Sequence, residues 1–590
     1  KNYFTVDGII KNRKSKLNRN ILKFINLDYE NINFINTNFD SINQFSLEID
    51  EKFNVNKITL NSDLSINQIE YKKLDIFDKH FLDINNLILF KNHKLKIQYK
   101  NNNLDLSGEG QIQIGKELDR IQYSINKKRD DLNLTAELYL KNIYLKTNDL
   151  LKNFFPKTNE KIKLINQKLK INYNKNNFSL SGSGKFKVDK DFEKIDYFFE
   201  KTENRINFKS KLNLEKTNFK IDNIKYKKKD TSNMLIEIIG DLDHSNKLNI
   251  KSFILNEDSN KIKIANLSLN NLSQIIKIDE AHFNYLDIEG KINIFSIKKI
   301  NNDDYKIYGN SFNANSLITN LLKSDEGKEN KLFEKNFSFD LNIKEVYLDK
   351  IHYVTDLKGN FIIDNNKVID ANILAFFNNK QKISFTINTN DQGEKITTLF
   401  SSQAKPLVNR YKFIKGFADG NKGFLDFYSS KKNGISKSKL IIDNFKVREI
   451  PALAKLLALA SLQGIADLLT GEGIRFTDFE MNFTNENKHM KIQELYAIGP
   501  AISILLEGYL EEDNLISLRG TLVPATTVNR TIASLPLIGD LLIGKKVGEG
   551  VFGVSFKIKG PPTNLETTVN PIKTLTPRFI TRTLEKIKKN

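Results

Sequence analysis

Apolar and polar residues alternate along most of the chain, from its first residues to about Asp443. Residues 95–99 read Leu-Lys-Ile-Gln-Tyr, and residues 104–106 and 112–114 continue the alternation. A period of two places successive side chains on opposite faces of a strand. Clusters of Asn, Asp, Lys and Gly separate these segments and are typical of turns. The pattern predicts a mostly β protein whose strands have one apolar and one polar face.

One stretch of the sequence is repeated at an offset of 74 residues. LKIQYKNNNLDLSGEG at 95–110 matches LKINYNKNNFSLSGSG at 169–184, and the match extends in register over 95–148 and 169–222. Repeated units of this kind bury their apolar edges against their neighbours in a stack. We interpret the glycines of the two units as bulge or turn glycines. These are Gly108, Gly110, Gly182 and Gly184.

A few short helices are expected among the strands. Residues 317–322 have helical spacing, and residues 451–469 form a longer apolar helix that starts near a proline and ends at a Gly-Glu-Gly sequence. The apolar side of this second helix either packs on a sheet or contacts a membrane surface. Its candidate contact residues are Leu453, Leu456, Leu457 and Leu462.

The last 150 residues differ from the rest in the pattern of strands and helices that their sequence predicts. Strands are expected at 473–484, 490–498, 502–510 and 550–559, a helix-like segment at 531–543, and a basic amphipathic tail at 576–589. We therefore divide the chain into a repetitive β region at 1–330, a continuation at 331–443 and a C-terminal domain at 444–590.

The amino-acid composition and net charge of the chain do not alter the prediction of a mostly β protein. The chain has 590 residues, of which 39% are hydrophobic and 27% charged, as in globular proteins. A formal net charge of +20 attracts nucleic acid, anionic lipid surfaces or acidic partners. The lysines recur singly, as at Lys94, Lys96 and Lys100, which favours solvated strand faces. Aromatic residues alternate with polar ones and fall on the apolar face, so we expect no nucleic-acid partner.

Residue patterns that carry chemistry are missing from the sequence. There is no cysteine, no stretch of about 18 apolar residues, and no Gly-x-Ser-x-Gly sequence. Residues 539–546 approach the phosphate-loop pattern, but Lys546 stands where Ser or Thr must bind the metal. No two histidines have the spacing of a helical zinc site. The six histidines are His80, His93, His244, His282, His352 and His489. We expect no enzymatic activity, cofactor, metal or small-molecule substrate.

The C-terminal part resembles the AsmA-like superfamily of Gram-negative envelope proteins, particularly its large YhdP-type members. FSFDLNIKEVYLDKIHYVTDLKGNFII at 337–363 resembles a paired-strand unit of that family, and IPALAKLLALASLQGIADLLTGEGIRF at 450–476 resembles its terminal helix and exit. The resemblance covers roughly the last 260 residues. Further matching stretches lie at 401–427, 520–529, 535–544, 548–561 and 569–579.

The resemblance implies an elongated antiparallel sheet curled into an open, taco-like groove, with a helix-containing AsmA-like C-terminal domain. Family members are implicated in moving phospholipid toward the outer membrane, and their architecture resembles that of eukaryotic bridge-like lipid transfer proteins. We therefore expect a periplasmic protein anchored in the inner membrane through a segment missing from this chain. Its expected partners are phospholipids and envelope proteins at both membranes. In this sequence Lys545-Lys546 replaces a more glycine-rich stretch of the family.

The leading hypothesis is a lipid conduit, because acyl chains can cover an apolar face that no second protein layer covers. An ordinary core between two sheets would show the same alternation. The alternatives are an assembly factor that pairs its strand edges with outer-membrane proteins, and a carbohydrate-active enzyme on a β-solenoid. The candidate lipid-groove residues are Leu95, Ile97, Tyr99, Leu104, Leu106, Ile112, Ile114, Leu169, Ile171, Tyr173, Phe178, Leu180, Phe186 and Val188.

Overall fold

The structure is a computed structural model, in which 73% of the residues are in strands and 4% are helical. The prediction of a mostly β protein is therefore confirmed. The residues it describes are 3–16, 32–33, 37–73, 80–129, 131–147, 149–158, 161–175, 177–202, 204–245, 247–271, 273–316, 318, 333–365, 367–378, 380–411, 417, 423–448, 453–454, 456–457, 471, 473–511, 514–524, 554–561 and 563–570.

The chain divides into two compact units, Lys1–Lys298 and Lys299–Asn590. This division lies before residue 330, the expected end of the repetitive β region. Each unit is built around a sheet whose long strands follow one another in chain order.

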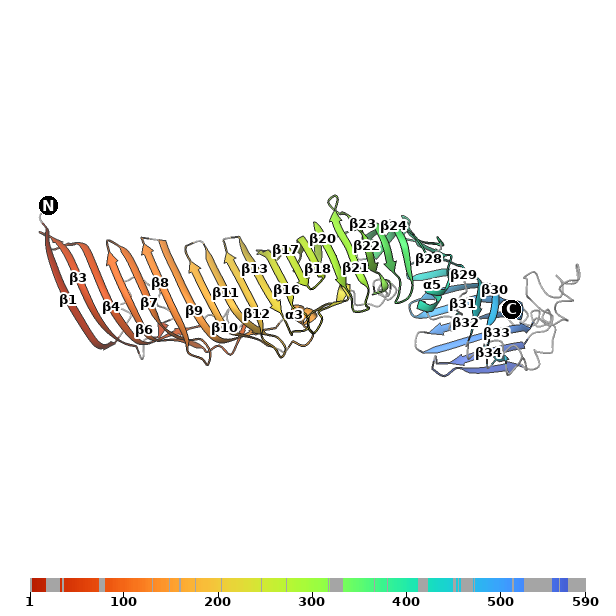
Figure 1. Ribbon diagram of the computed structural model, residues 1–590, viewed down its shortest axis with the longest axis horizontal. Coiled ribbons are helices and arrows are strands. Elements are labelled where there is room, and N and C mark those ends of the chain that lie inside the picture. The colour runs from red at the N-terminus through yellow and green to blue at the C-terminus, as the bar shows by residue number, and fades with distance from the viewer. Residues whose placement is uncertain are drawn as a thin grey trace, which may run out of the picture. The chain divides into compact units, whose positions relative to one another are not determined.

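In the N-terminal unit, sixteen long strands lie side by side, and each is antiparallel to the next (Figure 1). Turn residues of only a few positions connect most of them, as expected for antiparallel neighbours. The long strands are β1 (Tyr3–Lys16), β3 (Asn38–Asp50), β4 (Val55–Lys72), β6 (Leu87–Lys100), β7 (Asn103–Gln113), β8 (Asp119–Lys128), β9 (Asp131–Lys146), β10 (Lys161–Tyr173), β11 (Phe178–Lys187), β12 (Glu193–Lys201), β13 (Arg205–Leu214), β16 (Met234–Asp243), β17 (Leu248–Glu257), β18 (Asn260–Leu269), β20 (Glu280–Leu286) and β21 (Ile292–Lys299).

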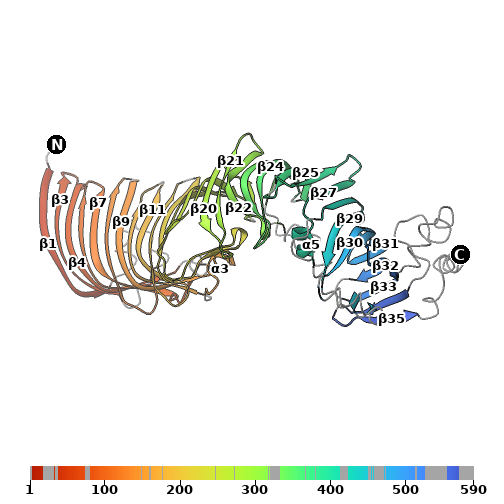
Figure 2. The same ribbon diagram turned by 45° about the vertical axis from the view of Figure 1, so that its right-hand side comes forward.

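Short elements accompany this sheet. The strands β2 (Ile32–Asn33), β5 (Phe81–Leu82) and β19 (Ile275–Lys277) pair with β4, β9 and β18. The helix α3 (Asp149–Phe154) lies at one end of the long strands (Figure 2). The strands β14 (Lys220–Ile221) and β15 (Tyr226–Lys227) form a separate hairpin around the 3₁₀ turn η1 (Asp222–Ile224).

The C-terminal unit begins with the parallel pair of β22 and β23 and continues as an antiparallel series to β35, so the expectation of an antiparallel sheet throughout was wrong and the pairing is mixed. Its strands are β22 (Asp304–Asn313), β23 (Phe337–Tyr347), β24 (Tyr353–Asp364), β25 (Lys367–Phe376), β26 (Lys382–Thr389), β27 (Lys395–Ser401), β28 (Leu425–Lys432), β29 (Ile435–Val447), β30 (Ile474–Glu486), β31 (His489–Ile498), β32 (Ile502–Glu511), β33 (Leu515–Pro524), β34 (Val554–Gly560) and β35 (Glu566–Asn570). A helix, α5 (Lys405–Tyr411), precedes β28.

The helices expected in this unit are described only in part. Residues 453–454 and 456–457 are helical, as are Asn315, Ser316 and Ile318, while Leu462 and the segments 531–543, 539–546 and 576–589 lie outside the described residues. The strands expected at 473–484, 490–498, 502–510 and 550–559 are present as β30, β31, β32 and β34.

The 74-residue repeat is a four-strand unit of the N-terminal sheet. The first copy is β6–β9 and the second is β10–β13. Strand β6 begins at Leu87 and β10 at Lys161, and β8 begins at Asp119 and β12 at Glu193, in each case 74 residues later. The two copies are adjacent, because β9 of the first pairs along its length with β10 of the second.

A bulge in β6 keeps its apolar side chains on one face although the alternation changes parity. Opposite β7 the pairing steps from Lys91 to Lys94, so β6 holds one extra residue there, and Asn92 has a φ of 54°. The extra residue shifts the period-two pattern by one position. Ile88 and Phe90 before the bulge therefore share a face with Leu95 after it.

Gly108 and Gly182 lie inside strands away from any bulge or turn, so their interpretation as bulge or turn glycines was wrong, whereas Gly110 and Gly184 lie opposite the extra residues of the bulges in β6 and β10. Gly108 is in the middle of β7, and a Cβ on it would lie 2.6 Å from the Tyr123 ring of the neighbouring strand. Gly182 in β11 lies in the same way beneath the ring of Tyr197. A ring laid across a strand glycine covers backbone that has no side chain of its own. Glycine is required here by close packing and not by a turn.

We expect Gly182→Ala to destabilise the N-terminal unit by about 1–3 kcal/mol, because the added methyl group must displace the Tyr197 ring. Urea unfolding of the purified chain measures the change. Ser183→Ala, at the next residue on the opposite face, is the matched control and should leave the midpoint almost unchanged. Equal midpoints for the two variants would show that the ring does not restrict this position.

Candidate functional site: the apolar face of the N-terminal sheet

Pairing across the sheet traces continuous rows of apolar side chains. Directly opposed residues of an antiparallel ladder point to the same face, so a chain of partners defines one row. The row that we call the middle row runs from β4 to β18. Its members are Leu64, Leu95, Gly108, Tyr123, Ala136, Ile171, Leu180, Phe199, Phe208, Gly240, Ile250 and Leu267.

A second row lies two residues further along each strand on the same face, and we call it the outer row. It contains a single charged residue, Lys201, among apolar ones from β6 to β18. Its members are Ile97, Leu106, Ile125, Leu134, Tyr173, Phe178, Lys201, Ile206, Leu242, Leu248 and Leu269.

The fourteen candidate residues share this apolar face but differ in how much water reaches them. Leu104, Leu106, Ile112, Phe186 and Val188 are buried. Leu95, Ile97, Tyr99, Ile114, Leu169, Ile171 and Leu180 are half-buried, and Tyr173 and Phe178 are exposed. Ile114 and Val188 directly follow the ends of β7 and β11.

One margin of the face is covered by protein. Residues 217–232, which include β14 and β15, lie over it and form the covering segment. The ring of Tyr226 in this segment packs edge-on against Tyr285 of β20, and the Tyr285 hydroxyl donates a hydrogen bond to the Ile224 carbonyl at 3.0 Å. Beneath it, Leu214, Met234 and Leu255 have no exposed surface.

A buried carboxylate holds the start of the covering segment, and its equivalent in the first repeat holds the backbone of β9. Glu193 accepts backbone hydrogen bonds from Glu215, Lys216 and Thr217 at 2.6–2.8 Å. Its equivalent in the first repeat, Asp119, accepts one from Lys141. Burial raises both pKa values, but the several backbone donors outweigh burial at Glu193 and leave its pKa lowered, whereas the pKa of Asp119 stays raised.

A buried polar pair occurs at equivalent positions of the two repeats with different residues. In the first, His93 Nδ1 lies 3.0 Å from the Tyr123 hydroxyl and Nε2 lies 3.0 Å from the Gln111 carbonyl. In the second, the Tyr197 hydroxyl donates to Gln167 Oε1 at 3.0 Å, and Gln167 Nε2 donates to the Lys185 carbonyl. The glutamine cannot exchange its donor and acceptor roles in this arrangement. By analogy, His93 carries its proton on Nε2 and accepts from Tyr123 through Nδ1.

The opposite margin of the face is open. Tyr173 and Phe178 are joined there by Phe199 and Ile206, and these four side chains are 36–42% exposed. We call them the open margin. Phe199 and Ile206 are not among the predicted site residues. Period two within β12 and β13, combined with the 74-residue offset from Ile125 and Leu132, is the signal that identifies them.

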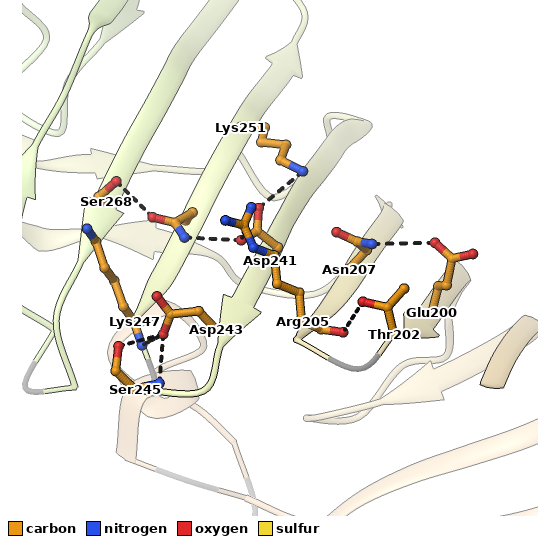
Figure 3. Close-up of polar contacts among 11 residues, drawn as sticks. Glu200, Thr202, Arg205, Asn207, Asp241, Asp243, Ser245, Lys247, Lys251 and Ser268 are labelled. Atoms are coloured by element: carbon orange, nitrogen blue, oxygen red, sulfur yellow. Dashed lines mark hydrogen bonds and ion pairs between the residues drawn. The ribbon is translucent and has the colours of Figure 1, made fainter. Parts of the chain in front are cut away.

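The other face of the sheet is polar, and its charges are compensated by neighbours. Asp241 accepts a hydrogen bond from Asn249 at 3.1 Å and forms ion pairs with Lys251 and Arg205 (Figure 3). Burial raises the pKa of the Asp241 carboxyl, but these partners outweigh burial and lower it. Ser268 continues the same row by donating to Asn249.

A hollow of 1390 Å³ extends across β1 to β10 on the polar face. Its lining includes Lys170 and Asn172 but not Ile171 between them, which places it on the polar side of β10. Of the fourteen candidate residues only Leu95 borders it. Lysines and acids lie side by side along it, as Lys94 and Glu109 do on the neighbouring strands β6 and β7.

In the C-terminal unit, Leu453, Leu456 and Leu457 are buried and belong to the hydrophobic core formed with residues of the sheet. Among the described residues, no helix is long and apolar enough to span a membrane, and no three His, Asp or Glu side chains gather as a metal site would require.

Comparison of the sequence with models of protein families finds no match, and comparison with curated proteins finds none either. The assignment of a function therefore depends on the residues of the chain itself.

We expect the stability of the N-terminal unit to fall as the pH falls below 6.5, in part because of His93. Burial lowers the pKa of this imidazole from 6.5 in the folded chain, so the unfolded chain binds the proton first. His93→Gln, which copies the second repeat, should lose less stability between pH 8 and pH 5 than the wild type.

Urea unfolding at the two pH values measures this difference. His93→Ala is the control: it removes the titration as well, but leaves the Tyr123 hydroxyl without its buried partner and should be less stable by about 1–3 kcal/mol at pH 8. If His93→Gln and the wild type lost the same stability at pH 5, the imidazole would not be the titrating group.

Proposed function

We propose that the apolar face of the N-terminal sheet binds the acyl chains of phospholipids, and that the protein moves these lipids between the inner and outer membranes of a Gram-negative bacterium. The observation that carries the proposal is the pair of apolar rows, interrupted by charge only at Lys201, whose members include the side chains of the open margin. No catalysed reaction is part of this function.

The open margin is energetically unfavourable in water. An aromatic side chain has an area of about 200 Å², so leaving about 40% of it exposed forgoes about 2 kcal/mol of burial. Phe178 and Phe199 are 36% and 38% exposed, and both point to the same face. A ligand that covers them gains this free energy, and a flexible hydrocarbon chain can do so at every strand.

The length of the rows favours several ligand molecules bound one after another, and not a single small molecule. The middle row crosses twelve strands, which at about 4.8 Å spacing give an apolar strip of roughly 50 Å. One acyl chain spans half of a hydrocarbon core of about 30 Å, or about 15 Å. Several lipids therefore fit along the strip, and each can move onto an equivalent surface of the next strands.

The covering segment supports a groove closed on one side and open on the other. Residues 217–232 would form its wall, and the open margin its lateral mouth. The resemblance of the C-terminal part to AsmA-like proteins, which implies a taco-like groove, an inner-membrane anchor and partners at both membranes, adds to the proposal. The charge of +20 supports contact with anionic lipid surfaces.

Paired substitutions on the two faces test the proposal. Phe199→Asp and Ile206→Asp place carboxylates in the proposed acyl path, where an unpaired charge costs several kcal/mol. We expect each to reduce the phospholipid that co-purifies with the chain by about tenfold or more, as measured by lipid mass spectrometry.

Phe198→Asp and Ile239→Asp are the matched controls, because these residues are 38% exposed like Phe199 and Ile206 but lie on the polar face. They should leave lipid content unchanged. Circular dichroism checks that all four variants fold. Equal lipid content in folded variants of both faces would exclude the conduit, and cross-links from strand edges to outer-membrane proteins in a lipid-free chain would favour the assembly role.

A further inference from the structure

Two lysines stand on the apolar face at equivalent positions of the two repeats. Lys127 lies in the last two residues of β8, and Lys201 ends β12, 74 residues later. Because the face is otherwise apolar at these ends of the strands, a cation kept in both copies is unusual there.

The surroundings of Lys201 are apolar and partly exposed to water. Its direct partners across the sheet are Phe178 and Ile206, and Phe199 lies two residues before it on the same face. These three side chains belong to the open margin. Lys201 is itself exposed, so its ammonium group lies at the edge of that margin.

Lys127 has the same position in the first repeat. Its direct partners are Leu104 and Leu132, which are buried and half-buried. Tyr99 pairs with Leu104, as Tyr173 pairs with Phe178 in the second repeat.

In these repeats the acidic residues of the apolar face lie at one margin, and the lysines lie at the other. The acids Asp119 and Glu193 begin β8 and β12 at the covered margin, where backbone N–H groups bind them. The lysines end the same strands at the opposite margin. The acids therefore bind the backbone of the chain at one margin, while the lysines lie at the other margin beside the apolar rows.

We infer that Lys127 and Lys201 bind the phosphate of phospholipid headgroups whose acyl chains lie on the middle and outer rows. This inference rests on the proposed function. A phosphodiester complements the ammonium group in charge, and its attached acyl chains complement Phe178, Phe199 and Ile206. The two lysines are four strands apart, or about 19 Å, which leaves room for one headgroup per repeat. A lysine that merely extends into solvent would not distinguish one lipid from another.

The test compares two fluorescent lipids with identical acyl chains, phosphatidylglycerol and diacylglycerol, which differ in the phosphate. The purified full chain is incubated with vesicles that contain one or the other, separated from them, and its bound fluorescence is measured. We expect the double variant K127Q/K201Q to bind less phosphatidylglycerol, by about fivefold for each lysine removed, and as much diacylglycerol as the wild type.

The matched control is K128Q/K209Q, which removes the same charge from polar-face positions of β8 and β13. It should bind both lipids like the wild type. Equal loss of phosphatidylglycerol in the two double variants would overturn the inference in favour of a general charge effect, and no loss in either would overturn it outright. If the wild type bound neither lipid, the proposed function itself would fail, and binding of inorganic phosphate alone would also contradict the lipid headgroup.

Discussion

A strand that alternates apolar and polar residues gives its sheet one face that must be removed from water. In a two-layer protein the second layer does this, and in the N-terminal unit the described residues supply such a cover at one margin, through residues 217–232 and the helix α3 that packs against them. The rest of the face depends on close packing between neighbouring rows, which buries Leu104 and Leu106, and on whatever binds at the open margin. The repeat, the strand glycines and the placement of charges all follow from the need to extend one apolar surface over many strands.

The charged residues of this surface lie only at its edges. The acids bind groups of the chain itself, and the lysines face the proposed ligand. Glu193 and Glu257 tie down the covering segment: Glu257 accepts a hydrogen bond from the Lys229 backbone at 2.7 Å and another from the Tyr226 hydroxyl. Hydrogen bonds to these carboxylates outweigh their burial and lower both pKa values. Both carboxylates are therefore ionised at neutral pH, in the form that accepts these hydrogen bonds. The open margin, by contrast, has aromatic side chains and a lysine, the combination that suits a ligand with a hydrocarbon part and an anionic part.

Much of this fold follows from the sequence, because its strongest signals are local. Period two predicts the strands, and the 74-residue offset predicts the boundaries of β6–β9 and β10–β13. What the sequence does not reveal depends on contacts across strands. Gly108 and Gly182 look like turn residues until Tyr123 and Tyr197 are seen above them. The covering segment cannot be predicted from the sequence for the same reason. Its Tyr226 contacts Tyr285, which lies 59 positions further along the chain. The face of Phe199 becomes clear only when its ladder partners are known.

The central claim is that hydrocarbon, and not protein, covers the open margin. A photo-reactive phenylalanine analogue at position 199, with position 198 as the opposite-face control, tests it most directly when the chain is irradiated in cells and its mass is measured. The account predicts adducts of phospholipid mass at position 199 and none at position 198. An adduct of position 199 with another protein, or with another part of this chain, would contradict it.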